Sequence, residues 1–289
     1  MTTTTVSLAQ MTIAHGDLAA NHASAQGLAR EAADRGSDLF LLPELWSSGY
    51  DLERADALAS EYPGGSFAVM REIAQREQMT VVGSVLEAQP QGIANCAAAF
   101  AADGALLGRY RKLHLFRLLD EDRYLIEGGE TKILELGWCR AGLQICYDLR
   151  FPELSRQYAL AGADLLLFPA EWPAVRVEHW RALLRARAIE NQCFVLACNG
   201  AGMSGSLEIG GHSAIINPWG ERLAEGGSEA TLLTAELDLT AVSQAREIIP
   251  VYQDRREDVY GSLQPTTTAA PSLKPAAQPA PVSAPIVNG

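Results

Sequence analysis

The sequence predicts an α/β fold in which helices cover one face of each sheet. Short apolar runs of strand length alternate along the chain with amphipathic segments of helical length, and this alternation is typical of layered α/β domains. The run at 39–42 is continuously apolar, as expected for a strand inside a covered sheet. The dipeptide Asp103-Gly104 lies between two strand-like runs, which indicates a hairpin and therefore a mixed sheet.

Length and composition favour one large domain. The chain has 289 residues, of which 48% are hydrophobic, enough for a sizeable core. From about Gly261 the composition changes to Pro, Ala, Thr and Ser with few large apolar side chains, which bury too little surface to order a segment. We therefore expect a folded domain at 1–261 and a flexible tail at 262–289.

The first part of the chain supplies strands and two covering helices. Leu18, Ala25, Leu28 and Ala32 recur at helical spacing, which predicts an amphipathic helix that ends near Gly36. The other expected elements are strands at 6–11, 39–42 and 80–86, a helix at 67–75, and hairpin strands at 93–100 and 105–110.

The second part repeats this alternation. A helix is expected to begin at Pro152, because proline suits the first turn of a helix. Cys193 and Cys198 lie in an apolar run, and we interpret both as core residues. The elements expected here are strands at 141–145, 164–168, 193–198 and 232–237, and helices at 152–161, 177–190 and 240–247.

Charge and cysteine content exclude several classes of partner. The net charge of −12 argues against binding to nucleic acid or to an anionic membrane surface. The five cysteines are an odd number without framework spacing, which favours free thiols in a reducing cytoplasm. The first residues have no basic or apolar signal region, and no apolar run reaches membrane-spanning length. We expect a cytoplasmic protein.

Cys146 is the first candidate for chemistry. It ends the apolar run 141–145, shortly before the helix expected at Pro152, so it should lie on a sharp strand-to-helix turn. That is the layout of a nucleophile elbow, with cysteine in place of serine. The backbone N–H of Tyr147 would point into the same space and could stabilise an oxyanion. The alternative is a buried cysteine that acts as a small hydrophobe.

Two further stretches favour the catalytic interpretation. Glu44 directly follows a buried apolar run, where a carboxylate is costly unless it is paired or used. Lys112 follows the strand expected at 105–110. Glu, Lys and Cys at the ends of strands form a workable set for acyl transfer, because the cation favours the thiolate and the oxyanion while the carboxylate carries protons.

These stretches resemble the three signatures of the nitrilase superfamily of carbon–nitrogen hydrolases. The resemblance covers about 6–260, with the signatures in the family's order and spacing: Pro43-Glu44, YRKLH at 110–114 and CYDLRFPE at 146–153. It implies a four-layer α-β-β-α sandwich of two mixed sheets. It also implies a homodimer or higher homo-oligomer that acts on a small-molecule amide with no metal or organic cofactor.

The resemblance also implies roles for individual residues. Cys146 would be the nucleophile of a thioester mechanism, Glu44 the general base, and Lys112 an oxyanion donor together with the Tyr147 N–H. The family places a second active-site glutamate in the acidic loop that is 117–129 here, where Glu121 fits best and Glu127 is the fallback.

Within the family, the chain looks most like the omega-amidase branch. The residues that carry this likeness are at 114–116, 119–121, 171–173 and 187–192. Omega-amidases hydrolyse the terminal amide of 2-oxo dicarboxylic acid monoamides such as 2-oxoglutaramate. The alternatives are an N-carbamoyl amidase, a deaminated glutathione amidase or a nitrilase with the same triad, and, in another class, a non-catalytic interaction module.

A substrate of the omega-amide type carries a carboxylate, so a cation should face the pocket. Arg117 and Arg176 are the candidates by position, and each is also compatible with an ordinary surface charge. Tyr50 and Trp172 lie in aromatic loops that could enclose a short chain.

Several other features are interpreted as structural. The G-x-G-x-x-G pattern at 200–205 is not followed by a helix-forming segment, so it is not a dinucleotide fingerprint. His212 is interpreted as a structural hydrogen-bonding residue. Asp148, Arg150 and Glu153 are expected to form a structural ion network around the elbow and to take no part in the reaction. The segment 248–260 is expected to extend across a subunit interface, as in related enzymes.

Overall fold

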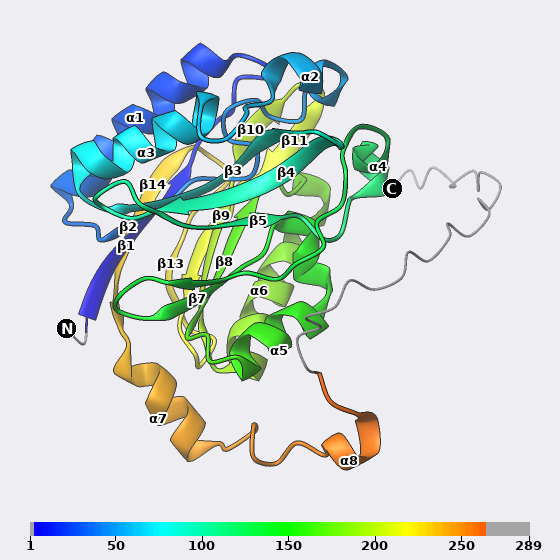
Figure 1. Ribbon diagram of the computed structural model, residues 1–289. Coiled ribbons are helices and arrows are strands. Elements are labelled where there is room, and N and C mark those ends of the chain that lie inside the picture. Colours follow the sequence, from blue (N-terminus) through cyan, green and yellow to red (C-terminus); the bar gives the residue numbers. More distant parts are fainter. Residues whose placement is uncertain (1–2, 264–289) are drawn as a thin grey trace, which may run out of the picture.

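The computed structural model describes residues 3–263 (Figure 1). The flexible tail predicted at 262–289 lies outside these residues except for its first two positions. The domain boundary at 261 therefore stays a prediction.

Two six-stranded mixed sheets form the centre of the molecule. Their middle strands pair in parallel and their outer strands pair antiparallel. In spatial order the first sheet contains β14 (Thr231–Asp238), β1 (Thr3–Gln10), β2 (Leu39–Leu41), β3 (Thr80–Gln89), β4 (Gly92–Phe100) and β5 (Leu106–Arg111). The second contains β13 (Arg222–Glu225), β12 (Ala214–Ile216), β9 (Phe194–Asn199), β8 (Leu165–Ala170), β7 (Arg140–Leu143) and β6 (Ile133–Glu135).

Helices cover the outer face of each sheet (Figure 1). The first sheet carries α1 (Leu18–Asp34) and α3 (Gly65–Glu77), and the second carries α5 (Pro152–Leu160) and α6 (Val177–Asn191). The remaining helices are α2 (Ala55–Leu58), α4 (Glu121–Tyr124), α7 (Thr240–Ile248) and α8 (Glu257–Tyr260). This arrangement confirms the predicted four-layer α-β-β-α sandwich.

The continuous apolar run at 39–42 is explained by burial on both faces of the first sheet. Leu39 and Leu41 pack in the cluster between the two sheets. Phe40 and Leu42 pack against α1 and α3 on the opposite face. Successive side chains of a strand point to opposite faces, so a strand covered on both sides needs apolar residues at every position.

The structure contains short strands that the sequence analysis did not predict. They are β6, β13 and the separate hairpin of β10 (Ala201–Ser204) and β11 (Leu207–Gly210). Each has three or four residues, too few for alternation to be recognised. The G-x-G-x-x-G pattern falls on this hairpin, whose turn contains Gly205 at φ +60°. This placement confirms that no helix follows the pattern.

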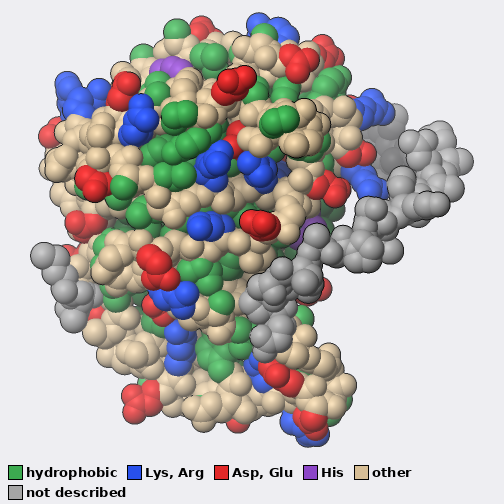
Figure 2. All heavy atoms as spheres, viewed as in Figure 1, with side chains coloured by type: hydrophobic (Ala, Val, Ile, Leu, Met, Phe, Trp, Pro, Cys, Tyr) green, Lys and Arg blue, Asp and Glu red, His purple; other side chains and the backbone are tan. Residues whose placement is uncertain are grey.

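The last described segment contains α7 and α8, which lie below the sandwich in Figure 1. Gln192, just after α6, donates to the Ala245 carbonyl of α7 at 2.9 Å. Ile248, Val259 and Tyr260 are 68%, 69% and 59% exposed. The subunit contact expected of this segment stays a prediction. On the face drawn in Figure 2, basic and acidic side chains are interspersed. Within residues 3–263, no helix is long and apolar enough to cross a membrane.

Candidate active site

Glu44, Lys112 and Cys146 each follow the carboxyl end of a strand. Glu44 comes shortly after β2, Lys112 directly after β5, and Cys146 shortly after β7. β2 and β5 belong to one sheet and β7 to the other. The three side chains nevertheless meet in one buried cluster. The structure therefore brings together the three residues that the sequence selected.

Cys146 lies on a strained turn. A single 3₁₀ turn, Cys146–Arg150, connects β7 to α5. The φ of Cys146 is +44°, a left-handed conformation that costs a residue with a Cβ roughly 1–3 kcal/mol. Asp148 holds this turn, because its Oδ2 accepts hydrogen bonds from the Ile145 N–H at 2.8 Å and from the Tyr110 hydroxyl at 2.7 Å. The backbone thus has the geometry of the predicted elbow.

The predicted ion network of Asp148, Arg150 and Glu153 is wrong. Among the described residues no ion pair joins any two of them, and Asp148 Oδ1 instead lies 2.7 Å from His114 Nδ1. Asp148 points inward to satisfy the N–H groups of the turn. The guanidinium of Arg150 lies over the ring of Trp172, 4.7 Å from its centroid, and Glu153 is exposed.

Lys112 is the centre of the buried charge cluster. Its Nζ lies 2.8 Å from Glu44 Oε1 and 2.6 Å from Glu121 Oε1. The Tyr50 hydroxyl donates to the same oxygen of Glu121 at 2.5 Å and lies 3.4 Å from Lys112 Nζ. None of the three charged side chains has solvent exposure. Two carboxylates therefore hold one ammonium group in a fixed position without water.

Further hydrogen bonds fix the orientation of both carboxylates. Asn95 Nδ2 donates to Glu44 Oε1 at 2.8 Å, and the backbone N–H of Glu171 donates to Glu44 Oε2 at 2.9 Å. The backbone N–H of Phe116 donates to Glu121 Oε2 at 2.7 Å. Such bonds satisfy oxygen atoms that would otherwise be costly to bury.

The surroundings set the protonation states of the cluster. Burial lowers the pKa of Lys112, but the carboxylates of Glu121 and Glu44 outweigh burial and raise it above its ordinary value. Lys112 is therefore a cation. Burial raises the pKa of the Cys146 thiol well above its usual range; Glu44 adds to this rise, and Lys112 opposes it. Cys146 is thus a neutral thiol at rest, beside a carboxylate that could take its proton.

The acidic loop contributes Glu121 to the cluster. Glu121 is fully buried against Lys112, at the start of α4. Glu127, the alternative in the sequence, is exposed and lines a hollow next to the cluster. The geometry therefore favours Glu121 over Glu127 as the second glutamate of the cluster.

A narrow cavity opens beside Cys146. Two cations border it: Arg150, over Trp172, and Arg176, whose guanidinium lies 5.9 Å from the ring centroid of Phe116. Within residues 3–263, neither guanidinium has a carboxylate partner at ion-pair distance. The complete lining is Phe116, Cys146, Tyr147, Arg150, Glu171, Trp172, Pro173 and Arg176.

The other predicted binding residues lie at different distances from this cavity. Tyr147 forms part of its wall directly after Cys146. Tyr50 contacts Lys112 and Glu121 deeper in the cluster. Arg117 is exposed, lies 3.9 Å from Asp122 and borders the neighbouring hollow. Of the two arginines predicted to face the cavity, the structure favours Arg176 over Arg117.

Sequence reasoning missed Arg150 and Glu171. Arg150 was assigned to the ion network, although its position one 3₁₀ turn after Cys146 carries it to the same cavity. Glu171 directly follows the apolar strand β8, as Glu44 follows the apolar run at 39–42. The argument that selected Glu44, the cost of a carboxylate after a buried strand, applies equally to Glu171.

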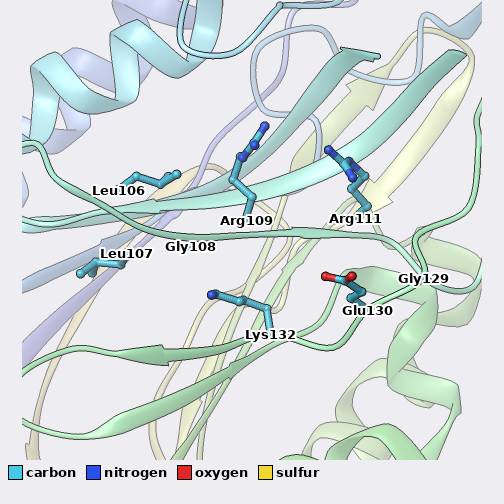
Figure 3. A pocket seen from close by; sticks show the side chains of 8 residues that line it. All are labelled: Leu106, Leu107, Gly108, Arg109, Arg111, Gly129, Glu130 and Lys132. Carbon is cyan, nitrogen blue, oxygen red and sulfur yellow. The ribbon is translucent and has the colours of Figure 1, made fainter. Parts of the chain in front are cut away.

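A larger hollow lies elsewhere, along β5 (Figure 3). Figure 3 shows Arg109 and Arg111 on one side of the strand and Lys132 and Glu130 on the other. Both arginines pair with the buried Glu87, Arg111 Nε at 2.6 Å from Oε2. The lining of this hollow contains no cysteine, serine or threonine, so its size does not make it the site of acyl transfer.

The cluster at Cys146 has the composition of an acyl-transfer site. A cysteine on a strained elbow lies beside a lysine and two carboxylates, an arrangement that suits nucleophilic attack on a carbonyl carbon. Among the described residues, no group of three His, Cys, Asp or Glu side chains could hold a metal ion. Fold and site together suit a hydrolase that acts by acyl transfer.

The chain belongs to the carbon–nitrogen hydrolase family of the nitrilase superfamily. The family pattern "Carbon-nitrogen hydrolase" matches residues 5–247. This finding confirms the predicted family and the predicted class of enzyme, a hydrolase of non-peptide carbon–nitrogen bonds of the amidase kind.

Three similar proteins illustrate the relationship. The chain is 42% identical over 257 residues to the 2-oxoglutaramate amidase of Bacillus subtilis, covering 89% of this chain and 99% of the relative. It is 36% identical over 250 residues to the omega-amidase NIT2 of Bos taurus, covering 83% and 91%. A CN-hydrolase superfamily protein of Xanthomonas campestris, solved with an arsenic adduct in its active site, matches with a TM-score of 0.84, 35% identity and coverage of 89% and 98%.

Proposed function

We propose that the chain hydrolyses a small carboxylate-bearing omega-amide, such as 2-oxoglutaramate, to the acid and ammonia. The observation that carries this proposal is the cavity itself. Its lining includes Cys146, which lies next to Glu44 and Lys112, and the arginines Arg150 and Arg176. The names of similar proteins, 2-oxoglutaramate amidase and omega-amidase, agree with this substrate class.

The first step forms a thioester. Cys146 Sγ attacks the amide carbon while Glu44 takes the thiol proton. The tetrahedral intermediate collapses, the carbon–nitrogen bond breaks, and Glu44 gives the proton to the departing nitrogen, which leaves as ammonia. One group acts as base and then as acid. The thiol is neutral at rest, so proton transfer accompanies the attack.

Lys112 and the Tyr147 N–H stabilise the oxyanion of the tetrahedral intermediate. The ammonium group is already held by Glu44 and Glu121, so it needs no reorganisation when charge develops on the carbonyl oxygen. Removing one such donor costs about 10²–10³ in kcat. Glu121, itself bonded to Tyr50, acts as a positioning residue for Lys112.

The second step releases the acid. Water attacks the thioester carbon while Glu44 takes one of its protons. The carbon–sulfur bond breaks, and the thiolate recovers the proton from Glu44. The enzyme returns to its starting state without a metal or organic cofactor in either step.

The charges of the site orient the substrate. The carboxylates of Glu44 and Glu121 lie beside Cys146, so the carboxylate of the substrate is repelled from the reacting group. Arg150 and Arg176 offer that carboxylate charge-assisted hydrogen bonds, which are often bidentate. The amide end is thereby directed to Cys146.

The test is ammonia release from a panel of compounds. We expect 2-oxoglutaramate or succinamate to exceed butyramide in kcat/KM by at least about tenfold, because loss of the carboxylate leaves an arginine unpaired at a cost of roughly 1–3 kcal/mol. Equal rates on butyramide would overturn the substrate class. Cys146→Ala is the control for contaminating activity.

The same panel separates the alternatives that share the triad. It includes a nitrile, an N-carbamoyl amino acid and deaminated glutathione. A clear preference for one of them would assign the corresponding activity. No ammonia release from any compound of the panel would favour a non-catalytic interaction module. The presence of Glu44, Lys112 and Cys146 together argues against such a module.

We also propose that the chain acts as a cytoplasmic homodimer or higher homo-oligomer. The apolar side chains of Ile248, Ile249, Val259 and Tyr260 are exposed on the last described segment, and a second copy could cover them. All five cysteines are free, which suits a reducing compartment. Light scattering after gel filtration gives the mass in solution, and a monomer would overturn the oligomer.

A further inference from the structure

Two buried polar side chains converge on one point beside the active site. The Glu171 side chain has no exposure, and Ser204 is 4% exposed at the end of β10. Among the described residues, neither carboxyl oxygen of Glu171 nor the Ser204 hydroxyl forms a hydrogen bond of normal geometry, although the two groups are close enough for the Ser204 hydroxyl to lower the pKa of Glu171. Both face the backbone of Gly49: a Cβ built there would lie 2.9 Å from Ser204 Oγ and 3.7 Å from Glu171 Oε1.

Glu171 connects this point to the reactive cavity. Glu171 lines the cavity together with Cys146. Its backbone N–H donates to Glu44 Oε2 at 2.9 Å. The same residue therefore orients the proposed base through its backbone and brings its own carboxyl group to the cavity. A buried polar group without a well-formed hydrogen bond lowers the free energy of unfolding by about 1–3 kcal/mol. Such a cost is expected where a polar group serves the chemistry of a site.

The carboxyl of Glu171 is not placed to form an ion pair. The nearest cation in the cluster, Lys112, is already held between Glu44 and Glu121. Burial raises the pKa of Glu171 well above its ordinary range, and the charge of Glu44 raises it further, against smaller opposing effects of Ser204 and Lys112. Glu171 is therefore a neutral acid at neutral pH, with one O–H donor and one C=O acceptor.

We propose that Glu171 and Ser204 form a subsite that positions the water molecule of the second step. This inference rests on the proposed function, because it needs the thioester on Cys146. The carboxyl and the hydroxyl each offer one donor and one acceptor. Together they match a molecule that both donates and accepts, and they do not match the anionic end of the substrate, which the carboxylates repel.

The step balances without further reagents. Held by Glu171 and Ser204, water attacks the thioester carbon and gives one proton to Glu44. The carbon–sulfur bond breaks, the electron pair stays on Cys146 Sγ, and the proton returns to sulfur. The product is the free acid. Hydroxylamine, a small neutral amine, can attack the same thioester in place of water and yields the hydroxamate.

Partition between these two nucleophiles tests the subsite. With an amide that is turned over and a fixed concentration of hydroxylamine, the ratio of hydroxamate to acid is measured. Both products come from the same thioester, so the ratio does not depend on the rate of acylation or on the fraction of folded enzyme. The variants are Ser204→Ala, Glu171→Leu and Glu171→Gln. Ser7→Ala is the matched control, because Ser7 is equally buried but lies in β1 and bonds to Ser37 and Thr234.

We expect Ser204→Ala and Glu171→Leu to raise the ratio of hydroxamate to acid at least about threefold. In each variant the bound water loses one of the hydrogen bonds that position it, so water attacks the thioester more slowly, while attack by hydroxylamine from solution is unchanged. Glu171→Gln keeps a donor and an acceptor and should stay near the original ratio, as should Ser7→Ala. If Glu171→Leu does not fold, Ser204→Ala decides alone.

An unchanged ratio in Ser204→Ala and Glu171→Leu would overturn the subsite and assign both groups a structural role. In that case ammonia is still released and the proposed function stands. No ammonia from any amide would instead overturn the proposed function, and the subsite with it.

Discussion

Replacement of Lys112 by Met removes the cation between Glu44 and Glu121 and keeps the length of the side chain. Both carboxylates lie within 2.8 Å of Nζ, and all three side chains are closed to solvent. Removing one partner of a buried ion pair costs about 3–5 kcal/mol, because the remaining charge is left uncompensated. We expect Lys112→Met to lose about this much free energy of unfolding, measured by urea denaturation.

Catalysis should suffer as well. The variant loses an oxyanion donor, a loss of about 10²–10³ in kcat. Turnover of 2-oxoglutaramate, followed by ammonia release under conditions in which the variant is still folded, checks this loss. The two measurements have to be made at the same pH, since protonation of the unpaired carboxylates would restore part of the stability.

The double variant Lys112→Met/Glu121→Gln separates stability from rate. It removes one of the two uncompensated carboxylates, so we expect it to regain much of the lost free energy of unfolding without regaining turnover. Near-normal turnover in either variant would refute the role of Lys112 in the reaction. Unchanged stability in the single variant would refute the charge balance derived from the structure.

Four further predictions follow from the site and the chain. Cys146→Ala should abolish ammonia release and keep the melting temperature, and iodoacetamide should label Cys146 before the other thiols; substantial residual turnover would remove it as the nucleophile. Arg150→Met and Arg176→Met should each raise KM for carboxylate-bearing amides more than for butyramide, and an equal effect on both would assign these arginines to the surface. Glu171→Gln should stabilise the fold more at pH 8 than at pH 5. The folded original protein keeps the Glu171 proton, whereas its unfolded chain releases that proton above the ordinary pKa of a glutamate, so the original protein loses stability as pH rises above that value. The variant has no such proton and should not show this loss, which urea denaturation at the two pH values measures. Truncation after residue 261 should leave melting temperature and activity almost unchanged, and a large loss of stability would show that the tail docks.

Glu44 and Cys146 could be found in the sequence because each ends an apolar run, and Lys112 because it lies in a basic cluster directly after an expected strand. A charged or reactive side chain at that position has a cost, and the cost marks it for attention. The same logic was not extended to Glu171 after β8. The error at Arg150 has a different cause: its charge suggested an ion pair with nearby acidic residues, while the 3₁₀ turn directs it to the cavity and Asp148 to the backbone of the elbow.

Local chemistry of the sequence determined the order of strands and helices, the position of the elbow and the three reactive side chains. Periodicity and apolar runs depend on residues close together in the chain, and they are therefore visible in it. The strands of three or four residues, such as β10 and β11, were not visible, because their pairing depends on partners rather than on pattern.

Only the tertiary structure decided which groups meet. The pairing of Lys112 with Glu121 rather than Glu127, the exclusion of Arg117 from the cavity and the convergence of Glu171 with Ser204 all join separate segments of the chain. A contact between distant residues is set by the packing of two sheets against each other. Packing is a property of shape and burial in three dimensions, which spacing along one chain does not encode.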